Sequence, residues 1–343
     1  MRYKLLGRSG LRVSELALGT MTFGSEWGWG SDKAESRKVF DTYLEHGGNF
    51  IDTANRYTEG TSEKFVGEFI AEKRESIVLA TKFTLKMRDG DPNAAGNHKK
   101  NMVQSLEASL KRLQTDYIDL YWLHAWDFTT RPDEVMRALD DVVRAGKVLY
   151  VGISDTPAWI VSQANTLAEL RGWSPFVALQ IEYSLIQRTV ERELLPMARY
   201  LDLGVTPWGI LGGGMLTGKY AAGNDEPKRM KDDSARLSEH NQQIAIEVGK
   251  VASEIGKSPS QVAINWLRQQ PGVIVPILGA RTAQQLKDNL GCLDFALNEN
   301  QIAKLHNASE IALGFPHDFV KQEPIRDIVY AGTYDRLDNH HLR

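Results

Sequence analysis

The chain repeats one unit along most of its length: a short apolar run followed by an amphipathic stretch. Eight apolar runs lie at residues 15–18, 49–52, 77–82, 117–124, 148–153, 176–181, 205–208 and 273–278. Such nearly uninterrupted runs are typical of parallel strands that are buried on both faces. Strands that alternate with helical crossovers indicate an α/β protein, and eight units favour a single (β/α)8 TIM barrel. An open doubly wound sheet is the alternative that strand counting leaves.

The amphipathic stretches predict the helices that connect these strands. They span residues 32–46, 62–71, 99–113, 132–145, 157–170, 190–201, 238–255 and 282–290, with a further helix from about residue 259. Ser31 is a suitable N-cap for the first helix, and Pro132 suits the first turn of the fourth.

Several segments fall outside the repeated units. Residues 2–12, with turn residues at 7–10, predict a small N-terminal hairpin ahead of the barrel. The stretch 212–237 is rich in glycine and then in charge, which predicts a mobile rim loop. A C-terminal extension holds a helix at 299–306 and then residues 311–343, which lack clear periodicity. No linker-like tract divides the chain, so we expect residues 1–343 to form one domain with its barrel core at about 15–290.

Composition excludes several classes of protein. The net charge of −3, from 41 basic and 44 acidic residues, gives no positive field for nucleic acid or an anionic membrane. The single cysteine, Cys292, excludes an intrachain disulfide and a zinc site of several thiolates, and its place after the last barrel helix gives it no catalytic role. Neither a signal-peptide core nor an apolar stretch of about 18 residues is evident. We therefore expect a cytoplasmic protein without nucleic-acid or membrane partners, with oligomer formation left open.

Titratable residues end three successive apolar runs. Asp52, Lys82 and His124 stand at these ends, and Tyr57 follows shortly after Asp52. Because the carboxyl ends of barrel strands meet at the active-site mouth, we expect these four side chains to converge.

The four side chains suit the protonation of a carbonyl oxygen. A phenol titrates at about pH 10, and a nearby ammonium lowers its pKa, so Lys82 is expected to make Tyr57 a proton donor nearer neutral pH. Asp52 would keep Lys82 charged and hold its ammonium in a fixed direction, and His124 would orient the substrate oxygen. No Ser-His or Cys-His nucleophile is evident, so the natural partner step is a hydride transfer, which requires a cofactor.

The cofactor site is predicted at the ends of the last strands. The G-x-G-x-x-G fingerprint is absent after the first strand. Gly212–Gly214 either bring backbone N–H groups toward a pyrophosphate, with Lys219 nearby, or form a flexible loop. Arg281 opens the helix after the eighth strand and is placed to grip a phosphate. Trp208 offers a flat face to a nicotinamide ring, and Gln180 offers an amide to its carboxamide.

At this point the sequence resembles the aldo-keto reductase family over roughly residues 3–289. The motifs that carry the resemblance are Leu16–Met21, Asn49–Ala54 with Tyr57 and Gly60, Ala80–Lys82, Asp116–Tyr121 with His124, Gly146–Val148 with Gly152–Ser154, Leu216–Tyr220 and Gly279–Thr282. The stretch Leu216–Tyr220 is similar to the bacterial and potassium-channel-β-like branch.

The resemblance implies a barrel that binds NADP(H) across its mouth and interconverts a carbonyl and an alcohol by hydride transfer. The family's catalytic tetrad maps onto Asp52, Tyr57, Lys82 and His124, with Tyr57 as general acid/base. Arg281 would contact the 2′-phosphate, so NADP(H) is expected to be preferred over NAD(H). The cofactor contacts that the resemblance implies are Gly19, Thr20, Met21, Asp52, Ser154, Asp155, Gln180, Trp208, Gly209, Leu211, Gly213, Lys219, Gly279, Arg281, Gln285, Asp288 and Asn289.

Three of these positions depart from the family's pattern. Asp155 stands where Asn is common, which puts its nicotinamide contact in question. Trp208 stands where Tyr is common, and Asp288 where Glu is common.

Aromatic residues predict the walls of the substrate pocket. They are Phe23, Trp27, Trp29, Phe83 and Trp126. Such walls favour an aromatic, terpenoid or otherwise bulky carbonyl over a small sugar phosphate. The loop 85–98 follows the third strand and is expected to trim the pocket.

Two further functions stay open at this point. An NADP(H)-binding regulatory subunit of the channel-β type would bind the nucleotide with little turnover and would have a stable partner or form a ring. A metal-dependent barrel isomerase or hydrolase would use His124 and Asp127, but no further His or paired carboxylate joins them. The complete tetrad favours the reductase, and we expect no metal.

Overall fold

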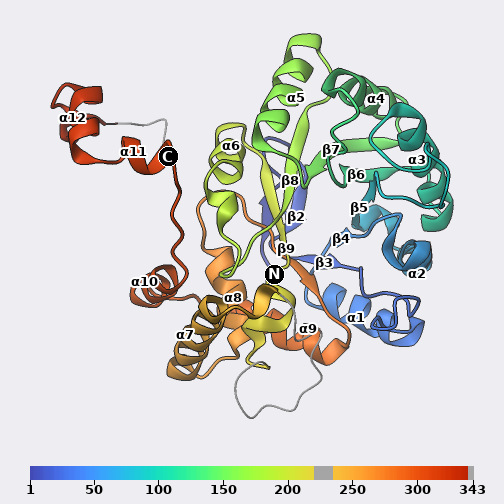
Figure 1. Cartoon of the computed structure of the whole chain (residues 1–343). Coiled ribbons are helices and arrows are strands. Elements are labelled where there is room, and N and C mark those ends of the chain that lie inside the picture. Colours follow the sequence, from blue (N-terminus) through green and yellow to red (C-terminus); the bar gives the residue numbers. More distant parts are fainter. Residues whose placement is uncertain (220–234, 339–343) are drawn as a thin grey trace.

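The computed structural model describes residues 1–219 and 235–338, which fold into a (β/α)8 barrel (Figure 1). Eight parallel strands pair in the order β10-β3-β4-β5-β6-β7-β8-β9. They are β3 (Ala17–Gly19), β4 (Phe50–Asp52), β5 (Val78–Phe83), β6 (Ile118–Leu123), β7 (Val148–Ser154), β8 (Phe176–Glu182), β9 (Gly204–Trp208) and β10 (Ile277–Gly279). Chain order is kept around the sheet, so the predicted fold class is confirmed.

A broken strand closes the barrel between β9 and β10. Val205 of β9 donates its N–H to the Val273 carbonyl at 2.7 Å and accepts from the Val275 N–H at 2.8 Å, while β10 itself pairs with β3. Pro276 lies between these two segments and, lacking an N–H, interrupts the pairing. The predicted strand 273–278 therefore pairs in two parts, residues 273–275 with β9 and the residues after Pro276 with β3. Because these two parts close the sheet, the alternative of an open doubly wound sheet is excluded.

Alternate strand residues face the barrel interior. Ala80, Trp122 and Ala178 pack together there, whereas the intervening side chains of the same strands face the helices. Gly152 makes room for the largest of them, because a Cβ at this position would lie 2.4 Å from the Trp122 ring. The same alternation carries Lys82, two residues after Ala80, into the mouth of the barrel.

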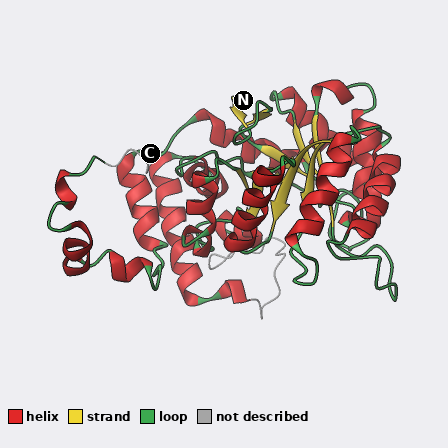
Figure 2. Ribbon diagram, turned by 90° about the horizontal axis from the view of Figure 1, so that it is seen from above, coloured by secondary structure: helices red, strands yellow, loops and turns green. Residues whose placement is uncertain are grey.

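A hairpin covers the amino-terminal end of the barrel. β1 (Tyr3–Leu5) pairs antiparallel with β2 (Arg12–Ser14), so the hairpin extends further than the predicted residues 2–12. Leu6 and Val13 are fully buried with interior barrel residues. Figure 2 shows the hairpin beside the N-terminus. The amino-terminal end of the barrel is therefore closed by the hairpin.

Ten helices of the described segments surround and extend the barrel. They are α1 (Lys33–Glu45), α2 (Thr61–Ile70), α3 (Lys99–Leu113), α4 (Pro132–Arg144), α5 (Ala158–Arg171), α6 (Leu194–Tyr200), α7 (Glu239–Ile255), α8 (Pro259–Arg268), α9 (Ala283–Leu290) and α10 (Glu299–Ala308). Within the described residues, no helix has the length and apolar character needed to cross a membrane.

Two helix starts differ from the prediction. Asp32, rather than Ser31, caps α1, since its Oδ1 accepts from the Glu35 N–H at 2.8 Å. The helix α6 begins four residues after the predicted start at 190, because Pro196 has no N–H and fits a helix only within its first turn.

The C-terminal extension holds two short helices that sequence periodicity did not predict. α11 (His317–Val320) and α12 (Glu323–Tyr330) stand apart from the barrel (Figure 1). Their apolar residues are exposed, with Ile328 at 76% and Val329 at 63%. A helix of 8 residues is too short for a helical period to be recognised against the surrounding sequence.

Candidate active site

Three side chains form a connected group at the mouth of the barrel. The Lys82 ammonium donates to Asp52 Oδ2 at 2.5 Å, to the Tyr57 hydroxyl at 3.0 Å and to the Thr53 carbonyl at 2.9 Å. The Lys82 and Asp52 side chains are 0% and 3% exposed, so water does not screen this pair. Asp52, Tyr57 and Lys82 are thus brought together as predicted.

Local backbone geometry places each member of this group. Asp52 is the last residue of β4, and Lys82 is the last but one of β5. Tyr57 begins a tight turn in which Thr58 and Glu59 take left-handed φ values of 45° and 56°. The Thr58 hydroxyl fixes this turn by donating to the Phe23 carbonyl at 2.6 Å.

The pKa of Tyr57 is raised, although the neighbouring Lys82 was expected to lower it. Burial raises the pKa of the Tyr57 hydroxyl, and the Lys82 ammonium offsets this only in part while the charge of Asp52 adds to it. Burial alone would lower the pKa of Lys82, but Asp52 and Tyr57 together raise it. At neutral pH the group therefore holds a charged ammonium beside a protonated phenol, and the predicted net lowering of the Tyr57 pKa was wrong because burial outweighs the effect of Lys82.

His124 completes the set immediately after β6. Its ring meets the Tyr57 ring edge-on, with 5.9 Å between the ring centroids. Burial lowers the pKa of His124 well below its usual value, and Lys82 lowers it further. The imidazole is therefore neutral at pH 7, and its buried Nδ1 has no hydrogen-bond partner among the described residues.

The predicted nicotinamide contacts lie around the same group. Gln180 Nε2 donates to Asp52 Oδ1 at 3.0 Å, so the amide also fixes the carboxylate. Ser154 is buried at the end of β7. The Trp208 indole N–H donates to Asp155 Oδ1 at 3.2 Å, and Asp155 has a left-handed φ of 40°. Asp155 therefore orients the ring that was predicted to face the nicotinamide.

The glycine run after β9 forms a tight turn. Gly212, Gly213 and Gly214 have φ values of 57°, 69° and 103°, and the turn Gly212–Thr217 packs against α7 and α8. Only glycine takes such consecutive conformations without strain. Leu211 precedes this turn and Lys219 follows it, while residues 220–234 of the predicted loop lie outside the described residues.

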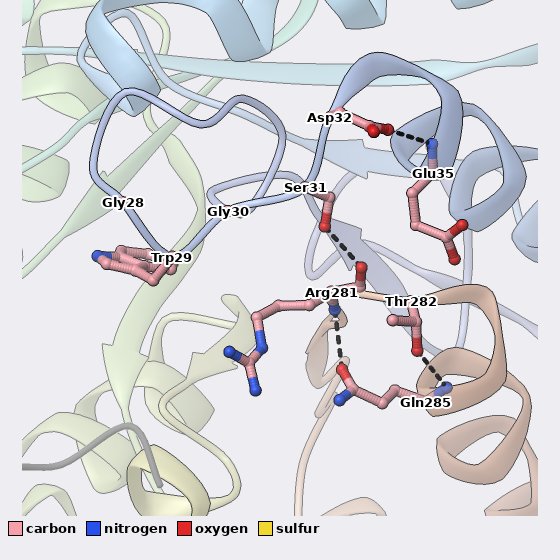
Figure 3. A pocket seen from close by; sticks show the side chains of 9 residues that line it. All are labelled: Gly28, Trp29, Gly30, Ser31, Asp32, Glu35, Arg281, Thr282 and Gln285. Atoms are coloured by element: carbon pink, nitrogen blue, oxygen red, sulfur yellow. Dashed lines mark hydrogen bonds between the residues drawn. The ribbon is translucent and has the colours of Figure 1, made fainter. Parts of the chain in front are cut away.

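Arg281 and Gln285, which follow β10, line a hollow of about 410 Å³ together with the loop before α1 and the first turn of α1 (Figure 3). The Arg281 N–H donates to Gln285 Oε1 at 3.0 Å, and Thr282 caps α9. Gly279, the last residue of β10, precedes this segment.

Several of the remaining predicted cofactor residues form contacts within the protein. Asp288 accepts from Ser258 Oγ at 2.9 Å and from Gln261 Nε2 at 3.2 Å, which joins α9 to α8. The Thr20 hydroxyl donates to the Asp52 carbonyl at 3.1 Å. A Cβ at Gly19 would meet the Ile277 side chain, and Gly209 takes a left-handed φ. The Asn289 side chain is buried, and Met21 is half-buried.

Two predicted substrate-pocket residues were wrong. Phe23 is 0% exposed and meets Phe69 edge-on in the layer between barrel and helices. Phe83 is 0% exposed and stacks on Tyr121, because it follows Lys82 and so points to the opposite face of β5. Neither side chain can touch a ligand in the mouth.

The tryptophans remain nearer the mouth. The Trp27 ring lies edge-on to the Tyr57 ring, with 6.5 Å between the ring centroids. The centroids of the Trp27 and Trp29 rings are 5.7 Å apart. Trp29 also lines the hollow beside Arg281. Trp126 is 9% exposed, and its backbone N–H donates to the Asp155 carbonyl at 3.3 Å.

The loop 85–98 is tied to the segment that carries His124. Thr84 has a φ of 93°, a strained conformation for a β-branched residue. Its hydroxyl donates to Asn97 Oδ1 at 2.7 Å and accepts from the His124 N–H at 3.3 Å. Sequence reasoning missed Thr84 and Asn97, because no spacing signals a strained residue or a loop-to-loop bond.

Asp127 and Cys292 have structural surroundings rather than a place in the mouth of the barrel. Asp127 accepts from the Asn97 N–H at 2.7 Å and from the Thr130 hydroxyl at 2.8 Å. In residues 1–219 and 235–338, no three His, Cys, Asp or Glu side chains converge on a point that suits a metal. Burial raises the pKa of Cys292 to about 12, which makes its thiol unreactive.

Comparison with known proteins identifies the family. The sequence profile of the Aldo/keto reductase family matches residues 15–310. The chain is 39% identical over 332 residues to norsolorinic acid reductase of Aspergillus flavus, covering 93% of this chain and 84% of that protein. It is 37% identical over 360 residues to an aryl-alcohol dehydrogenase, named as using NADP(+), of Phanerodontia chrysosporium, covering 95% and 91%.

These fungal relatives do not support the bacterial and channel-β-like branch that Leu216–Tyr220 indicated. The profile match and the extent of both alignments show the family and the class of reaction. The chain belongs to the aldo/keto reductase family and is a carbonyl oxidoreductase.

Proposed function

We propose that this protein reduces an aromatic or otherwise bulky aldehyde or ketone to the alcohol with NADPH, using Tyr57 as the general acid. One observation carries the proposal: the Tyr57 hydroxyl lies 3.0 Å from an ammonium that is itself paired with a buried carboxylate. NADPH supplies the hydride when bound, and the protein supplies the proton and the orientation of the substrate.

The proton leaves the oxygen of Tyr57. Burial keeps this proton on the phenol until negative charge develops on a substrate oxygen beside it. The Lys82 ammonium then stabilises the phenolate that remains, and Asp52 keeps Lys82 directed toward it. In the reverse direction the phenolate accepts the alcohol proton, so the same residues serve oxidation.

His124 orients the substrate oxygen as a neutral group. Because its pKa is far below neutrality, the ring forms a hydrogen bond without adding a second positive charge beside Lys82. Its edge-on contact with Tyr57 directs both side chains to the same space.

The described residues fit a dinucleotide. The left-handed glycines of the turn after β9 let a backbone approach a pyrophosphate closely, and Arg281 projects beside the start of α9 in Figure 3. Trp208, fixed by Asp155, would stack on the nicotinamide, with Ser154 and Gln180 at its carboxamide. Arg281 would bind the 2′-phosphate and favour NADPH over NADH.

The substrate class follows from Trp27 and from the relatives. Trp27 lies half-buried beside Tyr57 and offers an aromatic surface to a flat substrate. Similar proteins are named for aryl alcohols and for norsolorinic acid.

The test is NADPH consumption by the purified chain with aromatic aldehydes, quinones, keto-steroids and cyclic ketones, with the alcohol product identified. Turnover of an aromatic carbonyl is expected. Tight NADPH binding without turnover on the whole panel would contradict the proposal and indicate a nucleotide-binding subunit instead.

A further inference from the structure

The hollow beside Arg281 has walls of opposite charge. Its residues come from two places: the loop and first turn of α1, with Asp32 and Glu35, and the start of α9, with Arg281 and Thr282 (Figure 3). The two walls are joined, since the Ser31 hydroxyl donates to the Arg281 carbonyl at 2.6 Å. The hollow that Arg281 lines is therefore also lined by carboxylates of α1.

Glu35 is the carboxylate that reaches α9. Its Oε1 accepts from the Ala283 N–H, the first residue of α9, at 2.9 Å. This bond lowers the pKa of Glu35, and so does the exposed Lys38 ammonium, which donates to Glu35 Oε2 at 3.1 Å, so the side chain is charged at neutral pH. A backbone N–H in the first turn of a helix is a group that an anionic ligand uses, and here the protein's own anion occupies it.

Arg281 is held through its backbone, whereas Glu35 is held through its side chain. The Arg281 backbone is held on both sides, by Ser31 and by Gln285, while its guanidinium forms no ion pair within residues 1–219 and 235–338. In Figure 3 the Arg281 side chain and the Glu35 carboxylate lie on opposite sides of the Arg281–Thr282 segment. The start of α9 thus lies between a cation whose backbone is held and an anion whose carboxylate is held.

We propose that Glu35 sets how strongly the protein prefers NADPH over NADH. The inference rests on the proposed cofactor site. A 2′-phosphate carries close to two negative charges and is repelled by Glu35, whereas a free 2′-hydroxyl is neutral and can donate to a carboxylate. Arg281 favours the phosphate, and Glu35 reduces this advantage, so both nucleotides are accepted.

The experiment isolates the adenosine end of the nucleotide. Binding of 2′,5′-ADP and of 5′-AMP is measured by calorimetry for the full chain and for Glu35→Gln, at low ionic strength. Glutamine keeps an oxygen that accepts from the Ala283 N–H and removes the charge. Asp41→Asn is the matched control, because it removes a carboxylate from the exposed part of the same helix.

Glu35→Gln is expected to bind 2′,5′-ADP about fivefold more tightly, to leave 5′-AMP within about twofold, and to lose part of the difference at high salt. Glu35→Ala should act in the same direction at this position, whose side chain is 28% exposed. Unchanged 2′,5′-ADP affinity in both variants, or an equal gain in Asp41→Asn, would overturn the role of Glu35. If the unaltered chain binds neither nucleotide, the cofactor site itself is wrong.

Discussion

Replacing Lys82 by methionine removes the cation on which the site depends. Asp52 is then left with one partner, Gln180, and without a counter-ion at a side chain that is 3% exposed. Removing one member of a buried ion pair typically costs about 3–5 kcal/mol. Because the hydrogen bond from Gln180 remains, we expect the lower end of this range, about 3 kcal/mol.

Urea denaturation followed by circular dichroism measures this cost. Lys86→Met is the matched control: Lys86 pairs with Asp89 at the surface, where both side chains are more than half exposed, and no change in the unfolding midpoint is expected. The double variant Lys82→Met/Asp52→Asn removes both charges and should recover a large part of the loss. A loss below about 1 kcal/mol in Lys82→Met, or no recovery in the double variant, would refute the account of a strongly coupled buried pair.

Other predictions concern residues outside that pair. Because burial raises the pKa of Tyr57, kcat for reduction should show no inflection near neutral pH and should fall only above the ordinary phenol value of 10.0; an inflection near neutrality would contradict this. Because the pKa of His124 is depressed, the unfolded chain takes up a proton below pH 6.5 while the folded chain does not, so folding stability falls as pH decreases through this range. His124→Gln should flatten that part of the stability curve, and an unchanged slope would show that other groups cause it. Gly152→Ala brings a Cβ to 2.4 Å from the Trp122 ring and should cost about 1–3 kcal/mol of stability, which thermal unfolding would detect. Trp27→Ala should raise KM for aromatic aldehydes with little effect on KM for NADPH, and equal changes in both would remove Trp27 from the substrate pocket.

The barrel and the charged group at its mouth could be predicted because both depend on short-range patterns. Apolar runs mark buried strands, and a residue that ends such a run at the carboxyl side lies at the mouth. The same rule would have excluded Phe83 from the pocket, since it follows Lys82 directly and strand residues alternate in direction. The interruptions at Pro196 and Pro276 were likewise readable from the lack of an N–H.

Other features depend on contacts between distant segments. The pKa of Tyr57 is set by how deeply the turn after β4 is covered, which no motif encodes. Glu35 lies 248 residues from the N–H group that it binds, and nothing in its neighbourhood of the sequence distinguishes it from other exposed acids of α1. Asp288 matched a cofactor pattern, although its carboxylate joins two helices.

The central claim is that the Tyr57 hydroxyl gives its proton to the substrate. A single-turnover experiment tests this most directly: enzyme saturated with NADPH is mixed with an aromatic aldehyde, and the loss of NADPH absorbance is followed for the unaltered chain and for Tyr57→Phe. Phenylalanine keeps the ring and removes only the proton donor. The account predicts unchanged NADPH binding and a rate lower by about 10²–10⁴-fold in Tyr57→Phe. Equal rates in the two proteins would contradict it.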